Sequence, residues 1–237
     1  MVHSDRAPET TSPEIGTAPV TLIGRILPNS VATAEAFGAT ENSELFDEEL
    51  DAVGRAGNKR YQEFAAGRTC ARRALSQLGF SPVPILPGPN REPLWPRGIV
   101  GSITHCDSYV AAAIARESRL VTLGIDAEEN LPLPSGMIDL VSSHECDLSR
   151  GQDECGVCWD RLLFSAKESV FKAWFPLFRT WLEFKDVLVR IAPEPHSFMA
   201  VVLHDHKEEI TFSGRYAAFG TLLLTAVILE CQPHRDK

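Results

Sequence analysis

The chain has 237 residues and a hydrophobic fraction of 44%, enough to bury a core in one large domain or two small ones. Its 32 acidic and 23 basic residues give a formal net charge of −9, which argues against general binding to nucleic acids or to a membrane surface. We find no apolar run of the roughly 18 residues that a membrane span needs, and no signal-peptide pattern. The six cysteines form no disulfide framework, so we expect reduced thiols in a cytoplasmic protein.

The N-terminal region begins with a tail. Residues 1–18 are rich in Pro, Thr, Ser and Glu and lack periodicity, so we expect a disordered or loosely attached segment. The apolar run at 20–27 predicts a first strand, and the acidic segment at 44–55 predicts a helix.

The segment at 59–78 predicts a helix with one apolar side that is basic within an acidic protein. Arg60 and Arg68 are eight residues apart, about 80° around such a helix, so they can bind one anion together. The alternative is a solvated basic face without a ligand.

A proline-rich connection and a hairpin follow. The prolines spread through 81–96 predict an extended, turn-rich segment, in which Arg91 is the candidate ligand contact. The segment at 99–115 predicts two strands joined by a Cys-Asp-Ser turn, with His105 at the end of the first strand. A single histidine at such a place is more often a packing or surface residue than a ligand.

The sequence LGIDAE at 123–128 predicts a buried strand that ends in acid. Side chains alternate along a strand, so Asp126 and Glu128 project to the same side. Two neighbouring carboxylates repel each other, and a hard divalent cation with oxygen ligands is a common compensation. Solvated acids at a strand end are the alternative.

The sequence LFSAKESVFKAWFPLF at 163–178 predicts a helix with an apolar stripe, which Pro176 should kink or end. Lys167, Glu168 and Lys172 lie within this apolar segment, and burying uncompensated charges costs several kcal/mol. Glu168 could supply a third oxygen ligand to the two strand carboxylates, which would complete a Mg²⁺ site. The alternatives are a capping box at the S-A-K-E sequence and a surface pair between Glu168 and Lys172.

The remaining segments predict an antiparallel meander of four strands, at 186–192, 198–203, 210–216 and 220–229. The loop before the central helix holds four potential zinc ligands, His144, Cys146, Cys155 and Cys158. Unmetallated thiols are the alternative, and we favour them.

Three stretches together carry a family resemblance. GSITHC at 101–106, GIDAE at 124–128 and FSAKESVFKAWFPL at 164–177 resemble the three signature motifs of the Sfp-type 4'-phosphopantetheinyl transferases. The likeness is to the enterobactin-synthetase component D group. KRYQEFAAGR at 59–68 and REPLWP at 91–96 are similar to two accessory motifs of that group.

The resemblance implies an α+β fold in which two similar α/β halves are related by a pseudo-two-fold axis, with the active site in the cleft between them. The N-terminal half would be 19–118, on the side that binds the 3'-phosphate of coenzyme A. The C-terminal half would be 119–237, on the metal-binding and catalytic side. Two fused halves favour a monomer.

The resemblance also implies which residues hold coenzyme A. Arg60 and Arg68 would bind its phosphates, because the arginine fork suits phosphate oxygens. Arg91 stands where members of the group often have a basic residue that touches the coenzyme. His105 would contact the 3'-phosphate, with Thr104 beside it.

For the reaction centre, the resemblance implies that Asp126, Glu128 and Glu168 bind Mg²⁺, or Mn²⁺ in its place. Asp126 would also border the coenzyme, and Lys167 would bind a diphosphate oxygen. Lys172 would bind the coenzyme and stabilise the departing 3',5'-ADP. Either Glu168 or a water bound to the cation would be the base.

The implied activity is Mg²⁺-dependent transfer of the 4'-phosphopantetheine arm of coenzyme A to a serine hydroxyl of an apo acyl or peptidyl carrier protein. The products are the holo carrier and 3',5'-ADP, serving polyketide, nonribosomal-peptide or siderophore synthesis. The alternatives are another Mg²⁺-dependent phosphohydrolase and a catalytically silent module that binds coenzyme A or the carrier. The sequence names neither the carrier nor the preferred metal.

Overall fold

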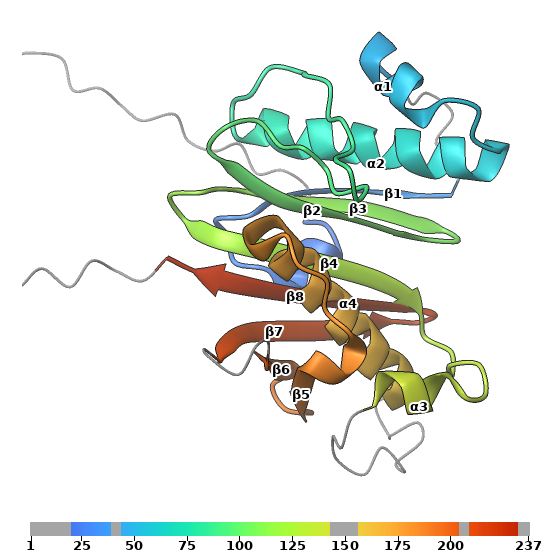
Figure 1. The fold of residues 1–237 in the computed structure, drawn as a ribbon, viewed down its shortest axis with the longest axis vertical. Helices are drawn as coiled ribbons and strands as arrows, with labels where there is room; N and C mark the ends of the chain where they lie inside the picture. Colours follow the sequence, from blue (N-terminus) through green and yellow to red (C-terminus); the bar gives the residue numbers. More distant parts are fainter. Residues whose placement is uncertain (1–19, 39–43, 143–155, 204–208, 232–237) are drawn as a thin grey trace, which may run out of the picture.

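The computed structural model describes residues 20–38, 44–142, 156–203 and 209–231 (Figure 1). The predicted tail at 1–18 lies outside these residues, and so do His144, Cys146 and Cys155 of the zinc alternative. The described helices are η1 (Ile23–Ile26), α1 (Asp47–Val53), α2 (Asn58–Gln77), α3 (Met137–Val141), α4 (Trp159–Phe178) and η3 (Phe184–Asp186). The described strands are β1 (Ala32–Phe37), β2 (Ile99–Cys106), β3 (Tyr109–Arg116), β4 (Leu120–Glu129), β5 (Val187–Ala192), β6 (Ser197–Val202), β7 (Ile210–Phe219) and β8 (Leu222–Glu230).

The prediction of a strand at 20–27 is wrong, because this segment contains the 3-10 helix η1. The carboxylate of Glu35 on β1 accepts hydrogen bonds from the backbone N–H groups of Leu22 and Ile23. These groups lie at the start of the helix, where N–H groups lack partners within the helix. A long-range contact therefore decides the conformation of an apolar run that is too short to show its period.

The first sheet is antiparallel, with strand order β1-β3-β2, and α2 covers one of its faces (Figure 1). Small side chains line the contact between helix and sheet, including Ala71 and Ala74 on α2 and Ala112 on β3. They allow the helix to lie close to the strands. The basic N-terminal end of α2 is thereby held against the sheet that carries His105.

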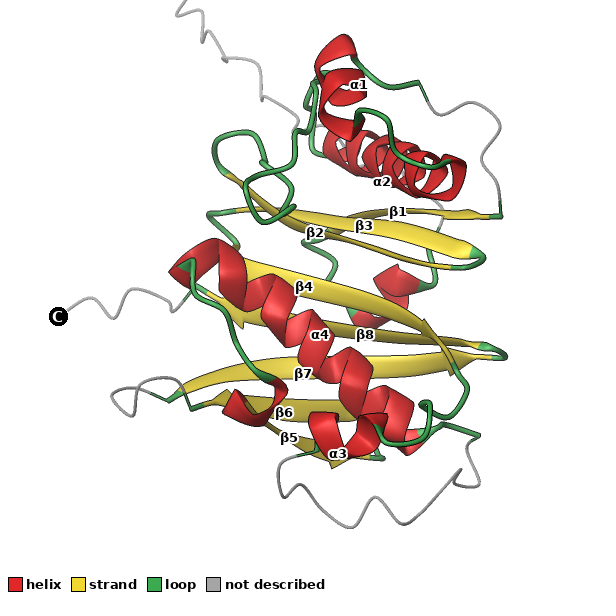
Figure 2. Ribbon diagram, turned by 45° about the vertical axis from the view of Figure 1, so that its right-hand side comes forward, coloured by secondary structure: helices red, strands yellow, loops and turns green. Residues whose placement is uncertain are grey.

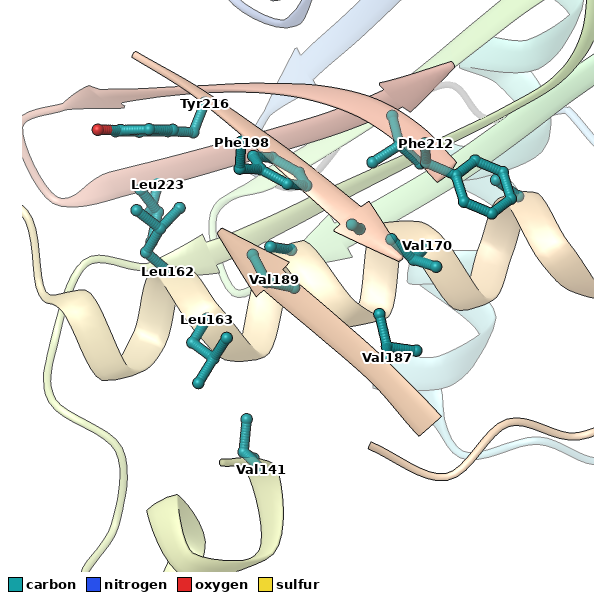
Figure 3. Close-up of a cluster of buried hydrophobic side chains, with 14 of the residues drawn as sticks. Val141, Leu162, Leu163, Val170, Val187, Val189, Phe198, Phe212, Tyr216 and Leu223 are labelled. Atoms are coloured by element: carbon teal, nitrogen blue, oxygen red, sulfur yellow. The ribbon is translucent and has the colours of Figure 1, made fainter. Parts of the chain in front are cut away.

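The second sheet is antiparallel, with strand order β4-β8-β7-β6-β5, and α4 lies across it (Figure 2). The apolar stripe of α4 packs on side chains from β5 to β8, and Figure 3 shows Leu162 and Val170 of the helix facing Phe198 and Phe212 of the strands. Pro176 lies inside the helix, which continues to Phe178. A proline this close to the end removes a hydrogen bond of only the last turn.

The two sheets meet along β2 and β4. The hydroxyl of Ser102 on β2 accepts the N–H of Ile125 at 3.1 Å, and that of Thr104 accepts the N–H of Ala127 at 3.0 Å. Side chains thus satisfy backbone groups that a neighbouring strand would otherwise pair. The α+β fold with two helix-covered sheets is confirmed, whereas the exact boundary at 118/119 stays a prediction.

None of the helices that the structure describes is both long and apolar enough to cross a membrane.

Candidate active site

Asp126 is the centre of a polar cluster between β4 and α4. Its side chain is almost completely buried. Oδ1 accepts a hydrogen bond from Lys172 Nζ at 2.6 Å and lies 3.3 Å from the hydroxyl of Thr104, while Oδ2 accepts one from the hydroxyl of Ser165 at 2.8 Å. The end of β2, from the first half, and helix α4, from the second half, thus both contact the carboxylate of Asp126.

Glu128 lies two residues further along β4, and an arginine holds it. Arg161 Nη1, in the first turns of α4, donates to Glu128 Oε2 at 2.8 Å. The pKa of Glu128 is nevertheless raised, first by burial and then by the negative charge of Asp126, against the opposing effect of Arg161. The charge of this carboxylate is therefore only partly compensated.

Glu168 is half-buried on α4 and forms no hydrogen bond or ion pair with another residue that the structure describes. Its pKa is raised, because burial and the charge of Asp126 disfavour ionisation more than Lys172 favours it. A carboxylate in this state can accept a proton or bind a cation.

These three carboxylates affect one another's ionisation, which places them in one electrostatic site. Within the described residues, however, no group of three or more His, Cys, Asp or Glu side chains is assembled as a metal site. Lys172 and Arg161 pair with two of the three carboxylates. The excess negative charge fits a hard cation, but side chains would have to rearrange to coordinate it.

His105 exposes its side chain at the end of β2, next to the start of α2. Its pKa is lowered mainly by partial desolvation, and the nearby charges of Lys172 and Arg60 lower it further, whereas Glu63 raises it. The structure thus brings Arg60, His105 and Lys172 together beside Asp126. This group of basic side chains can receive an anion.

Arg68 is placed differently from Arg60. Its side chain is buried, Nε donates to the carbonyl of Ile85 at 2.7 Å, and the guanidinium lies 4.1 Å from the ring centroid of Phe64. Burial lowers its pKa to about 10. These are the contacts of a packing residue, so a phosphate contact by Arg68 stays a prediction.

Arg91 is exposed in a tight turn where the bridge between Pro87 and Pro93 closes the loop. The neighbouring Glu92 pairs with Arg179 at the end of α4, so this loop of the first half is tied to the second half. No described contact of Arg91 tests its predicted role.

Lys167 is placed differently from Lys172, and its predicted contact with the diphosphate stays a prediction. Its side chain is 1% exposed, and its ammonium donates to the carbonyls of Val141 at 2.7 Å and of Phe184 at 2.8 Å. These carbonyls belong to the end of α3 and to η3. Lys167 therefore joins two short helices to α4 instead of facing Asp126.

Replacing Lys167 with methionine should leave the buried carbonyl of Val141 and the partly buried carbonyl of Phe184 without this donor and lower the stability of the protein by about 1–3 kcal/mol. Thermal unfolding would measure this loss, and titration calorimetry should show nearly wild-type affinity for coenzyme A. Lys185→Met is the control, since that ammonium is exposed and pairs with Glu183. A stable Lys167→Met protein that binds coenzyme A poorly would instead support the predicted contact of Lys167 with the diphosphate.

Three contributing residues escaped the sequence analysis: Arg161, Ser165 and Thr225. The fold brings Arg161 to Glu128, and it brings Ser165 and Thr225 to Asp126. Arg161 precedes the central motif and Thr225 lies on the last strand, so neither contact is visible in the sequence. Ser165 lies within the third signature motif, but from the sequence its hydroxyl could equally have capped the helix. The zinc alternative stays untested, and the thiol of Cys158 lies 3.5 Å from the carbonyl of Asn130.

A cavity of about 780 Å³ adjoins Glu168. Its walls include Leu140 of α3, Phe171 of α4 and the exposed Trp181, whose ring packs edge-on against Phe171 at 4.7 Å. The cavity is thus largely apolar, with the unpaired carboxylate in its wall. It can hold an extended molecule of mixed polarity next to the charged cluster.

The fold and site define an enzyme of two joined halves that handles an anionic substrate beside clustered carboxylates. Residues 47–115 match the 4'-phosphopantetheinyl transferase N-terminal domain, and residues 122–225 match the 4'-phosphopantetheinyl transferase superfamily. The chain belongs to this superfamily. It is a 4'-phosphopantetheinyl transferase, an enzyme that moves the phosphopantetheine group from coenzyme A to carrier proteins.

Curated relatives of the same kind align over most of the chain. The 4'-phosphopantetheinyl transferase Svp of Streptomyces mobaraensis is 43% identical over 87% of this chain and 88% of its own length. PptT of Mycobacterium tuberculosis is 38% identical over 88% of this chain and 98% of its own length. Npt of Nocardia iowensis is 41% identical over 87% of this chain and 99% of its own length. Enterobactin synthase component D of Escherichia coli K12 is 36% identical over 50% of this chain and 56% of its own length.

Proposed function

We propose that the enzyme works with Mg²⁺ and modifies a serine hydroxyl of an apo carrier protein, with Glu168 as the base. The observation that carries this proposal is an unpaired, half-buried carboxylate with a raised pKa, which lies between a cavity and the Asp126–Lys172 pair. A hydrolase would need the same acids, but it would not explain the match to the transferase family.

The metal would be held by Asp126, Glu128 and Glu168. The fit rests on charge: three carboxylates share one lysine and one arginine as ion-pair partners, and burial together with the charge of Asp126 raises the pKa values of Glu128 and Glu168. When bound, Mg²⁺ would neutralise the diphosphate and make its β-phosphorus more electrophilic. Mn²⁺ prefers similar oxygen ligands, so it should replace Mg²⁺.

Arg60 and His105 would bind the 3'-phosphate of coenzyme A. Both lie at the edge of the site, one on α2 and one on β2, and both carry or can carry positive charge. The phosphate would raise the lowered pKa of His105, so its binding should be accompanied by proton uptake. Arg91 is an exposed arginine of the tied loop, and we retain it as a further phosphate contact.

The pantetheine arm would lie in the cavity beside Glu168. The arm combines methyl and amide groups, and the cavity combines Phe171 and Trp181 with polar wall residues. In this placement the thiol end of the arm lies away from the charged cluster around Asp126. The diphosphate would then lie at the inner end, near Lys172.

In the reaction, the serine oxygen forms a bond to the β-phosphorus, and the bond from that phosphorus to the bridging oxygen breaks. Glu168 takes the proton of the serine hydroxyl. Lys172 leaves Asp126 and donates a hydrogen bond to the departing 3',5'-ADP, which balances its developing charge. Arg60 and His105 hold the same leaving group by its other phosphate.

We also propose carriers of polyketide, nonribosomal-peptide or siderophore synthesis as substrates, since one group of relatives carries the name of enterobactin synthase. A cytoplasmic location agrees with the unpaired thiols of Cys70, Cys106 and Cys231. A monomer is the expected state, because both halves of the site come from one chain.

Intact-mass spectrometry of apo carrier proteins tests the function. Incubation with coenzyme A, Mg²⁺ and the enzyme should add one phosphopantetheine group to the carrier and release 3',5'-ADP. Chelation of the metal should stop the reaction, and either Mg²⁺ or Mn²⁺ should restore it. 3'-Dephospho-coenzyme A should bind more weakly, unless Arg60 and His105 are both replaced. Hydrolysis of coenzyme A without a modified carrier would favour the phosphohydrolase instead.

A further inference from the structure

Ser165 and Thr225 form a buried polar pair behind Asp126. Both side chains are completely buried, in a region where α4 otherwise packs on the sheet through apolar groups. Thr225 is the direct cross-strand partner of Asp126, and Ser165 lies on the helix above both. Three elements thus contribute one polar group each to the same point.

The protons of this pair can be assigned from its contacts. The Ser165 hydroxyl lies 2.8 Å from Asp126 Oδ2 and 2.9 Å from the hydroxyl of Thr225. The Thr225 hydroxyl can donate to the backbone carbonyl of Ser165, also at 2.9 Å. An ionised Asp126 only accepts hydrogen bonds, so the single proton of Ser165 goes to Asp126. Thr225 then donates within the pair and leaves the serine proton directed at the carboxylate.

We infer that Ser165 and Thr225 are positioning residues that fix the rotation of the Asp126 carboxylate and so present its Oδ1 edge to the cation. Among the described residues, Oδ2 is engaged by Ser165, whereas Oδ1 is held by Lys172 and, at 3.3 Å, by Thr104. Lys172 can leave when a cation arrives, but the buried serine cannot. This inference rests on the proposed metal site.

A purely structural role makes a different prediction. Removing one buried hydroxyl leaves its partners unsatisfied, which lowers stability by about 1–3 kcal/mol but leaves the Mn²⁺ affinity of the folded protein unchanged. Loss of a group that orients a metal ligand instead weakens metal binding by about 10–100-fold. Metal affinity, measured apart from activity, therefore separates the two roles.

The test measures Mn²⁺ binding to the full-length protein by electron paramagnetic resonance of the free ion. Ser165→Ala should raise the Kd for Mn²⁺ about 10–100-fold. Thr225→Val should raise it less, and Thr225→Ser should restore it because the hydroxyl is kept. Ser169→Ala is the matched control, since this serine of the same helix is also fully buried but donates to its own helix at Ala166. It should bind Mn²⁺ like the wild type.

Two further measurements show that the effect acts through Asp126. With Asp126→Asn already present, Ser165→Ala should cause no additional loss of Mn²⁺ affinity. Binding of 3',5'-ADP without metal should stay unchanged, which shows an intact fold. If Ser165→Ala does not fold, Thr225→Val and Thr225→Ser carry the comparison.

Wild-type Mn²⁺ affinity in Ser165→Ala and Thr225→Val would overturn this inference and leave the metal site standing. Failure of the wild-type protein to bind Mn²⁺, alone or with coenzyme A, would overturn both.

Discussion

Replacement of Glu168 with glutamine is expected to reduce kcat/KM for carrier modification by about 10²–10⁴-fold. Glutamine keeps the shape of the side chain but cannot accept a proton or compensate a cation with a full charge. Glu168 has no hydrogen-bond partner among the described residues, and its raised pKa means that its ionised form is disfavoured in the folded state, so the substitution should not lower thermal stability. Intact-mass assays of the carrier at several coenzyme A concentrations would measure the loss.

The pH dependence of the wild-type enzyme gives an independent check. A base must be deprotonated, so activity should fall as the pH decreases through the pKa of Glu168, which is raised in the metal-free site and which a bound cation would lower. Asp139→Asn is the matched control, since this exposed carboxylate lines the same cavity. If Glu168→Gln retains most of its activity, Glu168 is not the base. If it loses Mn²⁺ binding together with activity, its main role is that of a metal ligand.

Replacement of Gly124 with alanine is expected to destabilise the protein by about 3 kcal/mol or more. A Cβ atom at this position would lie 2.0 Å from the carbonyl oxygen of Ser169 and 2.8 Å from the backbone nitrogen of Ala173. Both atoms belong to the backbone of α4, so no side chain can move aside and the whole helix must shift. Since α4 carries Glu168 and Lys172 and β4 carries Asp126, transfer activity should be lost as well.

Thermal or denaturant unfolding measures this effect, and a loss of about 3 kcal/mol corresponds to a decrease in Tm of roughly 6–12 °C for a chain of this size. Gly57→Ala is the control, because a Cβ there meets no atom within 4 Å and the residue has an ordinary φ of −62°. It should cost about 1 kcal/mol or less, since alanine is the poorer N-cap. Equal stability of both variants would show that α4 does not rest directly on β4.

The sequence alone predicted the elements whose pattern is local. The long helix at 163–178, the basic helix at 59–78, the hairpin and the final meander all appear in the structure within a few residues of the expected bounds. Hydrophobic periodicity and turn residues are sufficient for such elements. The strand at 32–37 and the short helix at 137–141 were missed, because neither is long enough to show a period.

For the site, the motifs indicated the family and the carboxylates on β4 and α4. Acidic residues at the end of a buried strand, and charged residues within an apolar helix, can be recognised in the sequence because burying them is unfavourable without a partner. Their partners were not visible. Lys167 and Lys172 are five residues apart and chemically identical, yet one binds backbone carbonyls and the other binds Asp126.

Only the tertiary structure decided this division, because five residues along a helix turn a side chain by about 140° and so place the two ammonium groups on different faces. It likewise brought Thr225 opposite Asp126 and Arg161 to Glu128. The sequence by itself determined which chemical groups the protein has. The packing of α4 on β4 determined which of them meet.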